Sequence, residues 1–130
     1  MGNKQQVLIV EDDTDTMNLL KQIVLGLGYE PVLAHGGREA VEMLQTTEPD
    51  LVLLDLIMRD MDGWTVLMTI KATPNLSDIP VFIISARAPS EHPSRVEALG
   101  DLYEAYFIKP FEVDDLARKI QKVLGSHPVG

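Results

Sequence analysis

Four apolar segments of this 130-residue sequence end in residues that could do chemistry. Three acids, Glu11–Asp13, follow the apolar run Val7–Val10, and Asp55 follows a second run. Ser85 and Lys109 follow a third and a fourth. Buried strands have no need of three successive acids at their ends, and placing those acids beside Asp55 costs electrostatic repulsion. This pattern predicts a bound cation.

Mg²⁺ is the cation that suits such a cluster. It prefers six oxygen ligands, and proteins commonly hold it through one or two carboxylates while water and a substrate phosphate fill the other positions. Lys109 would supply a second positive charge on the other side of the cluster. The set therefore indicates a site for a phosphoryl group.

Five strands are predicted to position these residues. Their apolar residues are continuous rather than alternating, which is typical of strands buried on both faces of a parallel sheet. They are Val7–Val10, Pro31–Ala34, Leu51–Leu54, Val81–Ile84 and Ala105–Ile108.

Five helices are predicted between and after these strands, because apolar residues recur there at intervals of three and four. We expect Gly28 to end the first helix in a left-handed conformation. The helical segments contain Met17, Leu20, Val24 and Leu27; Ala40, Val41 and Leu44; Val66, Leu67 and Ile70; Ser94–Leu99; and Val113, Leu116, Ile120, Val123 and Leu124.

The alternating order of strands and helices predicts a flavodoxin-like three-layer α/β fold, with a five-stranded parallel sheet and five helices. Ligands of such folds bind outside the carboxyl ends of the strands, where the strand order reverses. We expect a single domain over residues 1–125, followed by a frayed tail or the start of a linker at residues 126–130.

With these segments in order, the sequence resembles the receiver domains of bacterial-type two-component response regulators, and is similar to the stand-alone chemotaxis and sporulation receivers. The resemblance covers nearly the whole chain. It is carried by LIVEDD at residues 8–13, LVLLDLIMRDMDG at 51–63, VFIISA at 81–86 and YFIKPF at 106–111.

The resemblance implies a metal-dependent phosphoacceptor. Asp55 would be the nucleophile that takes the phosphoryl group. Mg²⁺ would be bound by Asp12 directly, by Glu11 mainly through water, by Asp55, and by the backbone carbonyl of Ile57.

The resemblance also implies a switch. Ser85 and Lys109 would bind phosphoryl oxygens, Tyr106 would follow Ser85 inward, and the Lys109–Pro110 bond would be cis, a geometry that costs little only before proline. The phosphoryl donor would be a phosphohistidine of a sensor histidine kinase or a phosphotransfer protein. The domain would catalyse its own phosphorylation and dephosphorylation without being an enzyme in the ordinary sense. The switched surface, near the fourth helix and the fifth strand, would bind a downstream protein, and a homodimer would form through the face between the fourth and fifth helices.

Several of these residues also have a structural interpretation. Asp12 and Asp13 could cap the first helix, since an acid there satisfies free N–H groups. Tyr106 could be a half-buried strand aromatic. Asp62 and Gly63 are expected to form a turn, with Gly63 in a conformation that side chains resist.

Two features depart from the family pattern. Arg59 stands where receivers commonly have proline, which would loosen the loop after the third strand. Ser85 and Lys109 lie 24 positions apart, about two more than the resemblance implies, and the extra length falls in Ala88–Ser94. Arg87 could lean over the site and tune the lifetime of the aspartyl phosphate.

Composition excludes several classes of function. The net charge of −9 disfavours nucleic acid and anionic membranes as partners, since no basic patch interrupts it. The absence of cysteine excludes disulfides and thiolate metal sites. The first apolar run is too short for a signal peptide or a membrane span, so we expect a cytoplasmic protein.

Three other functions compete with this interpretation. A receiver-like interaction domain that works without phosphorylation would be expected to have lost at least one of the site residues. A phosphohydrolase with an Asp nucleophile would resemble its relatives in having a second Asp where this chain has Ile57. A flavin or nucleotide binder would need a glycine-rich phosphate loop, whereas the first strand here runs into acids.

Overall fold

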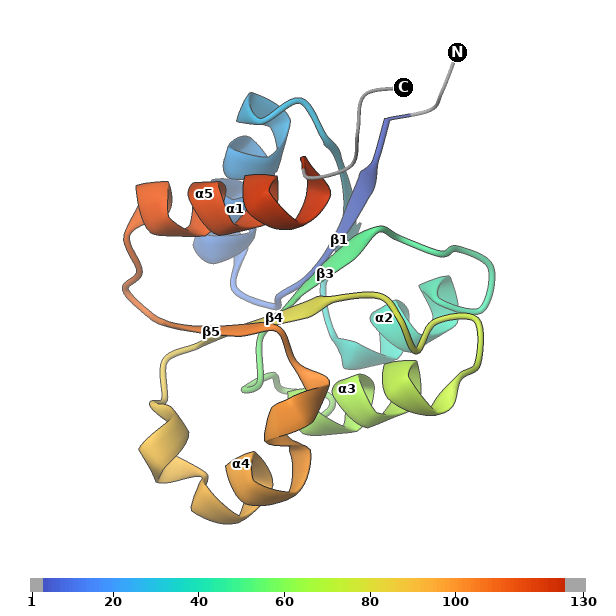
Figure 1. Ribbon diagram of the computed structural model, residues 1–130, viewed down its shortest axis with the longest axis vertical. Helices are drawn as coiled ribbons and strands as arrows, with labels where there is room; N and C mark the ends of the chain where they lie inside the picture. Colours follow the sequence, from blue (N-terminus) through green and yellow to red (C-terminus); the bar gives the residue numbers. More distant parts are fainter. Residues whose placement is uncertain (1–3, 126–130) are drawn as a thin grey trace.

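The computed structural model describes residues 4–125 as a parallel sheet between two layers of helices (Figure 1). The predicted fold is confirmed, and the tail predicted at 126–130 lies outside the described residues. The elements are β1 (Gln6–Val10), α1 (Thr14–Gly26), β2 (Glu30–Ala34), α2 (Gly37–Met43), β3 (Leu51–Leu54), α3 (Gly63–Ala72), β4 (Val81–Ser85), α4 (Pro93–Leu99), β5 (Ala105–Ile108) and α5 (Val113–Leu124), with short 3-10 helices η1 (Pro89–Glu91) and η2 (Gly100–Leu102).

The strands lie in the order β2-β1-β3-β4-β5, and every neighbouring pair is parallel. The order reverses between β1 and β3, because the chain crosses from β2 on one side of β1 to β3 on the other. The carboxyl ends of β1 and β3 therefore border the crevice where this kind of fold binds its ligands.

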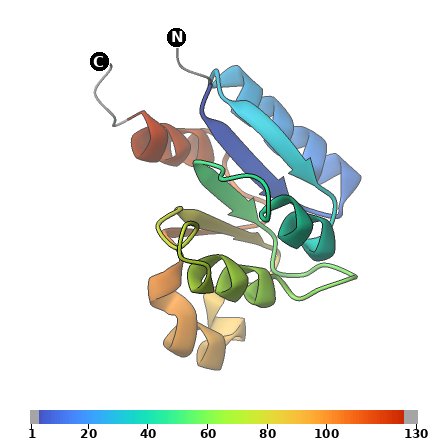
Figure 2. The same ribbon diagram turned by 90° about the vertical axis from the view of Figure 1, so that its right-hand side faces the viewer.

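Both faces of the sheet are buried, which is why the strand sequences are continuously apolar. Successive residues of a strand point to opposite faces. Val7 and Ile9 of β1 pack in the cluster with α1 and α5, whereas Leu8 and Val10 pack in the cluster with α2 and α3. The two helical layers are seen on opposite sides of the sheet in Figure 2.

Helix α1 begins and ends where the sequence predicts. The side chain of Asp13 caps it by accepting hydrogen bonds from the Thr16 N–H at 2.9 Å and the Thr16 hydroxyl at 2.7 Å. These bonds hold the pKa of the Asp13 carboxyl below its usual value. Gly28 follows the helix with a φ of 88°, the left-handed conformation expected there. Of the two interpretations of Asp13, the structure supports the cap.

The conformation predicted for Gly63 is wrong, although a glycine is required at this position. Asp62 caps α3 through a bond from the Trp64 N–H, and Gly63 is the first helical residue, without a positive φ. Space is what requires a glycine here. A Cβ atom at this position would lie 2.3 Å from the carbonyl oxygen of Asp55 and 2.6 Å from the Cα of Leu56.

The extra residues before α4 form a compact segment. Ala88–Ser94 contains the 3-10 turn η1 and then His92, which precedes α4. The His92 ring packs edge-on against Trp64 of α3, with ring centroids 5.8 Å apart. The longer connection is thus folded against the α3 layer. None of the helices within residues 4–125 is long and apolar enough to cross a membrane.

Candidate phosphorylation and metal site

The hydrogen-bond ladder of the sheet continues into the residues that follow the strands. The Glu11 N–H donates to the last carbonyl of β2 at 3.1 Å, and the Asp55 N–H donates to the last carbonyl of β1 at 3.0 Å. The Lys109 N–H donates to the last carbonyl of β4 at 2.8 Å. The sheet itself therefore fixes the backbone of three predicted site residues at one edge.

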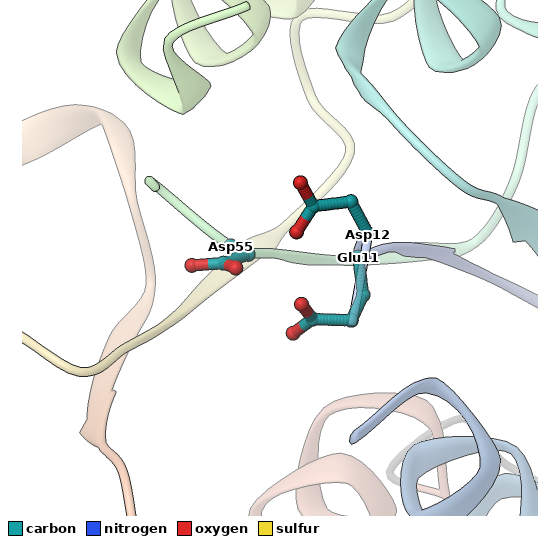
Figure 3. Close-up of side chains that lie close together, drawn as sticks. All are labelled: Glu11, Asp12 and Asp55. Carbon is teal, nitrogen blue, oxygen red and sulfur yellow. The ribbon is translucent and has the colours of Figure 1, made fainter. Parts of the chain in front are cut away.

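Three carboxyl groups meet at this edge. One oxygen each of Glu11, Asp12 and Asp55 lies within 4.8 Å of the others (Figure 3). Glu11 is 1% exposed and Asp55 4% exposed, so two of the three acids are taken out of water. The Glu11 and Asp12 side chains extend from opposite sides of their backbone, with Asp55 beside both (Figure 3). The predicted cluster of acids is present. Asp13 does not belong to it, because its side chain caps α1.

Lys109 provides the positive charge nearest to this cluster. Its Nζ atom lies 2.8 Å from Glu11 Oε1 and 3.4 Å from Asp55 Oδ2. Burial lowers the pKa of the Lys109 ammonium, but the bond to Glu11 and the charge of Asp55 more than offset this, so its pKa is raised. The Lys109–Pro110 bond is cis, as predicted.

Glu11 is the most perturbed acid of the cluster. Burial raises its pKa from 4.5 to about 7, helped by the charge of Asp55 and opposed by the bond from Lys109. Its second oxygen accepts a bond from the Asp13 N–H at 3.1 Å. An acid with this pKa is only partly ionised at neutral pH, so a cation that binds here would displace a proton, and its affinity would rise with pH.

Asp55 is held by its own loop. Its Oδ1 atom accepts a hydrogen bond from the Ile57 N–H at 3.1 Å, which leaves Oδ2 facing Lys109. The Ile57 side chain is 45% exposed beside the site. The predicted role of the Ile57 carbonyl as a metal ligand stays a prediction.

Asp12 has a partner that the sequence did not reveal. Its Oδ2 atom accepts a bond from the backbone N–H of Arg59 at 3.0 Å, and the Arg59 Nε lies 3.4 Å from the same oxygen. Arg59 was expected to loosen the loop after β3. Instead, the structure ties this loop to Asp12, through a backbone N–H that proline would not have.

Asp60 holds the other side of the same loop. Its carboxylate accepts bonds from the N–H groups of Gly37 at 3.0 Å and Arg38 at 3.1 Å, at the start of α2. These bonds, led by that from Arg38, lower the pKa of Asp60. The contact joins a loop residue to the start of a helix more than twenty positions away, which no periodicity could have predicted.

The two residues predicted to switch are connected through the loop after β4. Ser85 is fully buried, and its Oγ accepts a bond from the Arg87 N–H at 3.1 Å. The Tyr106 hydroxyl donates to the Arg87 carbonyl at 2.5 Å. Burial raises the pKa of the Tyr106 phenol. A movement of the loop at Arg87 would therefore change the hydrogen bonds of both side chains.

The carboxylates fit a hard divalent cation. Their oxygens are the ligand type that Mg²⁺ and Ca²⁺ prefer, and they lie close enough together to share one ion. Two of them are buried and would otherwise repel each other. Glu11, Asp12 and Asp55 can therefore hold a metal at the mouth of the crevice between β1 and β3.

Comparison with known proteins agrees with this architecture. The family model described as "Response regulator receiver domain" matches residues 7–121. The chain is 38% identical over 118 residues to the transcriptional regulatory protein ZraR of Escherichia coli K12, which covers 91% of this chain but only 26% of that protein. It is 31% identical over 122 residues to the polar-differentiation response regulator DivK of Brucella ovis, covering 94% of this chain and 98% of DivK.

A solved structure shows the same fold with a metal. The receiver domain of a sensor histidine kinase from Pseudomonas aeruginosa PAO1, with a magnesium ion coordinated in its active site cleft, superposes with a TM-score of 0.84 at 27% identity. The match covers 95% of this chain and all of that one.

Proposed function

Because the chain belongs to the response regulator receiver domain family, we propose that it accepts a phosphoryl group on Asp55 in a Mg²⁺-dependent reaction. The observation that carries this proposal is the meeting of Asp55 with two further carboxylates on one side and the Lys109 ammonium on the other. A buried acid with a purely structural role would be stabilised by the ammonium alone and would gain nothing from two further carboxylates beside it.

The chemistry follows from these positions. An oxygen of Asp55 attacks the phosphorus of a phosphohistidine, the new P–O bond forms as the P–N bond breaks, and the imidazole leaves with its electron pair. Lys109, whose Nζ lies 3.4 Å from Asp55 Oδ2, is close enough to bind an oxygen of the transferred group. Bound Mg²⁺ would neutralise charge on the phosphoryl oxygens. The same groups would assist hydrolysis of the aspartyl phosphate, so the domain would catalyse both its phosphorylation and its dephosphorylation.

For the metal, we propose Asp12 and Asp55 as direct ligands, Glu11 as a ligand acting mainly through water, and the Ile57 carbonyl as the remaining protein ligand. The Asp12 side chain is 19% exposed, so an ion that arrives from solvent can reach it, which supports a direct role. The bond between the Ile57 N–H and Asp55 keeps the Ile57 peptide close to the phosphoacceptor.

Phosphorylation would be passed on through Ser85 and Tyr106. In the structure the Ser85 hydroxyl accepts from Arg87, and it would turn to donate to a phosphoryl oxygen. This would release the Arg87 peptide, to which the Tyr106 hydroxyl is also bonded, and let Tyr106 move. The consequence would be a change of the surface around α4 and β5. A tuning role of the Arg87 side chain in phosphoryl lifetime stays a prediction.

The partners would be proteins. A sensor histidine kinase or a phosphotransfer protein would present its phosphohistidine at the mouth of the site, near the exposed Leu19 of α1 and Ile57. A downstream protein would bind the face around α4 and β5. A homodimer would form through the face between α4 and α5, where Ile108 on the edge strand β5 is 45% exposed. We expect the reaction to take place in the cytoplasm, because the donor protein would take its phosphoryl group from ATP.

The test is the intact mass of the protein after incubation with Mg²⁺ and acetyl phosphate. The gain of one phosphoryl group should depend on Mg²⁺, disappear in Asp55→Asn, and persist in Asp101→Asn, which changes an exposed acid elsewhere. A folded wild-type protein that gains no mass would refute the proposal and leave the alternative, a receiver-like interaction domain that works without phosphorylation.

A further inference from the structure

Arg59 makes two contacts with one oxygen of a proposed metal ligand. Both its backbone N–H, at 3.0 Å, and its Nε, at 3.4 Å, point at Asp12 Oδ2. A carboxylate oxygen that accepts two N–H groups has less electron density and less room to offer to a cation. In the metal-free protein Arg59 therefore occupies one of the two oxygens that Asp12 could offer to an ion.

The loop around Arg59 is anchored, so this contact is a built feature of the fold. Arg59 lies between Asp55 and α3, and the next residue, Asp60, is bonded to the N–H groups of Gly37 and Arg38. The Arg59 backbone is thereby held over Asp12. Its side chain, in contrast, is 89% exposed and can swing into solvent without disturbing any packing.

Lys109 does not play the same part. It is bonded to Glu11 and Asp55 from the interior side of the cluster, with 21% of its side chain exposed, and the proposed reaction needs it there. Arg59 approaches from the solvent side and bonds only to Asp12 among the three clustered acids. Mg²⁺ can therefore displace the guanidinium of Arg59 while Lys109 stays in place.

We propose that Arg59 competes with Mg²⁺ for Asp12 and so sets the Mg²⁺ concentration at which the site fills. This inference rests on the metal site of the proposed function. Arg59 would be a positioning residue with no contact to the phosphoryl group. Its guanidinium would hold Asp12 in the metal-free state and move away when the ion binds, while its backbone stays in place.

The test is a Mg²⁺ titration of the unphosphorylated protein, followed by NMR through the amide signals and the indole signal of its single tryptophan, Trp64. Wild type, Arg59→Ala and Arg95→Ala are compared at constant ionic strength. Arg95 is the matched control, because it lines the same cleft of about 510 Å³ beside the site but pairs with Asp62, at 3.6 Å.

Arg59→Ala should bind Mg²⁺ about two- to fivefold more tightly than wild type, the factor expected for an exposed ion pair, and the difference should shrink at high salt. Arg95→Ala should bind like wild type. Arg59→Pro, which also removes the backbone N–H, should bind at least as tightly as Arg59→Ala.

Equal affinities of wild type and Arg59→Ala would overturn the inference while leaving the metal site intact. Equal gains in Arg59→Ala and Arg95→Ala would also overturn it, since the effect would then be one of general charge. If no protein of the series bound Mg²⁺, the metal site of the proposed function would fail, and the inference with it.

Discussion

Replacing Lys109 by methionine should destabilise the metal-free protein by an amount that grows with pH. The substitution keeps most of the alkyl chain and removes the ammonium that lies 2.8 Å from Glu11 Oε1 and 3.4 Å from Asp55 Oδ2. Both acids are nearly inaccessible to water. Without Lys109, they would be two neighbouring buried acids with no cation between them.

The size of the loss follows from the ionisation of Glu11. Removing one partner of a buried ion pair costs about 3–5 kcal/mol, and the 21% exposure of the Lys109 side chain places this pair toward the lower end. At pH 8, above the Glu11 pKa of about 7, the carboxylate loses its counter-ion, and we expect a loss of about 3 kcal/mol. At pH 6 Glu11 is largely protonated, so a loss of about 1 kcal/mol, typical of one hydrogen bond, is expected.

Urea denaturation in the presence of EDTA, at pH 6 and pH 8, measures this difference. Lys122→Met is the control, because Lys122 is an exposed lysine of α5. It should change stability little at either pH. A Lys109→Met loss that is the same at both values, or smaller at pH 8, would refute the coupling between Lys109 and Glu11.

Three further predictions follow from the structure. Without metal, the wild-type free energy of unfolding should fall as pH rises from about 4.5 to above 7, because the raised Glu11 pKa favours folding only while Glu11 is protonated; Glu11→Gln should flatten this part of a urea-based pH profile. Gly63→Ala should lower stability by about 1–3 kcal/mol in thermal unfolding, since its Cβ would overlap the backbone at the end of β3, whereas Gly26→Ala, with open space around it, should not be destabilising. Tyr106→Phe should lose the bond to the Arg87 carbonyl, cost about 0.5–1.5 kcal/mol in urea denaturation, and leave the rate of phosphorylation by acetyl phosphate unchanged.

The parts of the site that follow strands could be predicted from the sequence. A continuously apolar run such as Leu51–Leu54 is typical of a strand buried on both faces, and parallel strands bring their carboxyl ends to one edge. Glu11, Asp55 and Lys109 therefore had to converge once the strands were assigned, as their backbone bonds to neighbouring strands show. Local signals likewise sufficed for Gly28, which ends α1 as expected.

The contacts of the loop after β3 could not be predicted in this way. Arg59 and Asp12 lie 47 positions apart, and their bond depends on the path of an irregular segment. Gly63 shows the same limit: its sequence context indicated a turn, whereas a glycine is required because the backbone of Asp55 and Leu56, just after β3, approaches it closely. Periodicity and capping rules describe single elements, but such contacts arise only when segments distant in the sequence, or a loop and a helix, are folded against each other.

The charges around the cluster explain why both kinds of contact are needed. Three carboxylates carry a formal charge of −3, and in the metal-free protein Lys109 and Arg59 supply only two positive charges. Burial of Glu11, which raises its pKa to about 7, removes part of the remaining negative charge by favouring its protonated form. Exchange of Arg59 for Mg²⁺ would bring the positive charge beside the cluster to three, with Lys109, and would allow all three acids to ionise. A site with Lys109 alone would be too negative without metal, whereas a second fixed interior cation would oppose the ion. An exposed arginine bonded to Asp12 stabilises the empty site and can still leave.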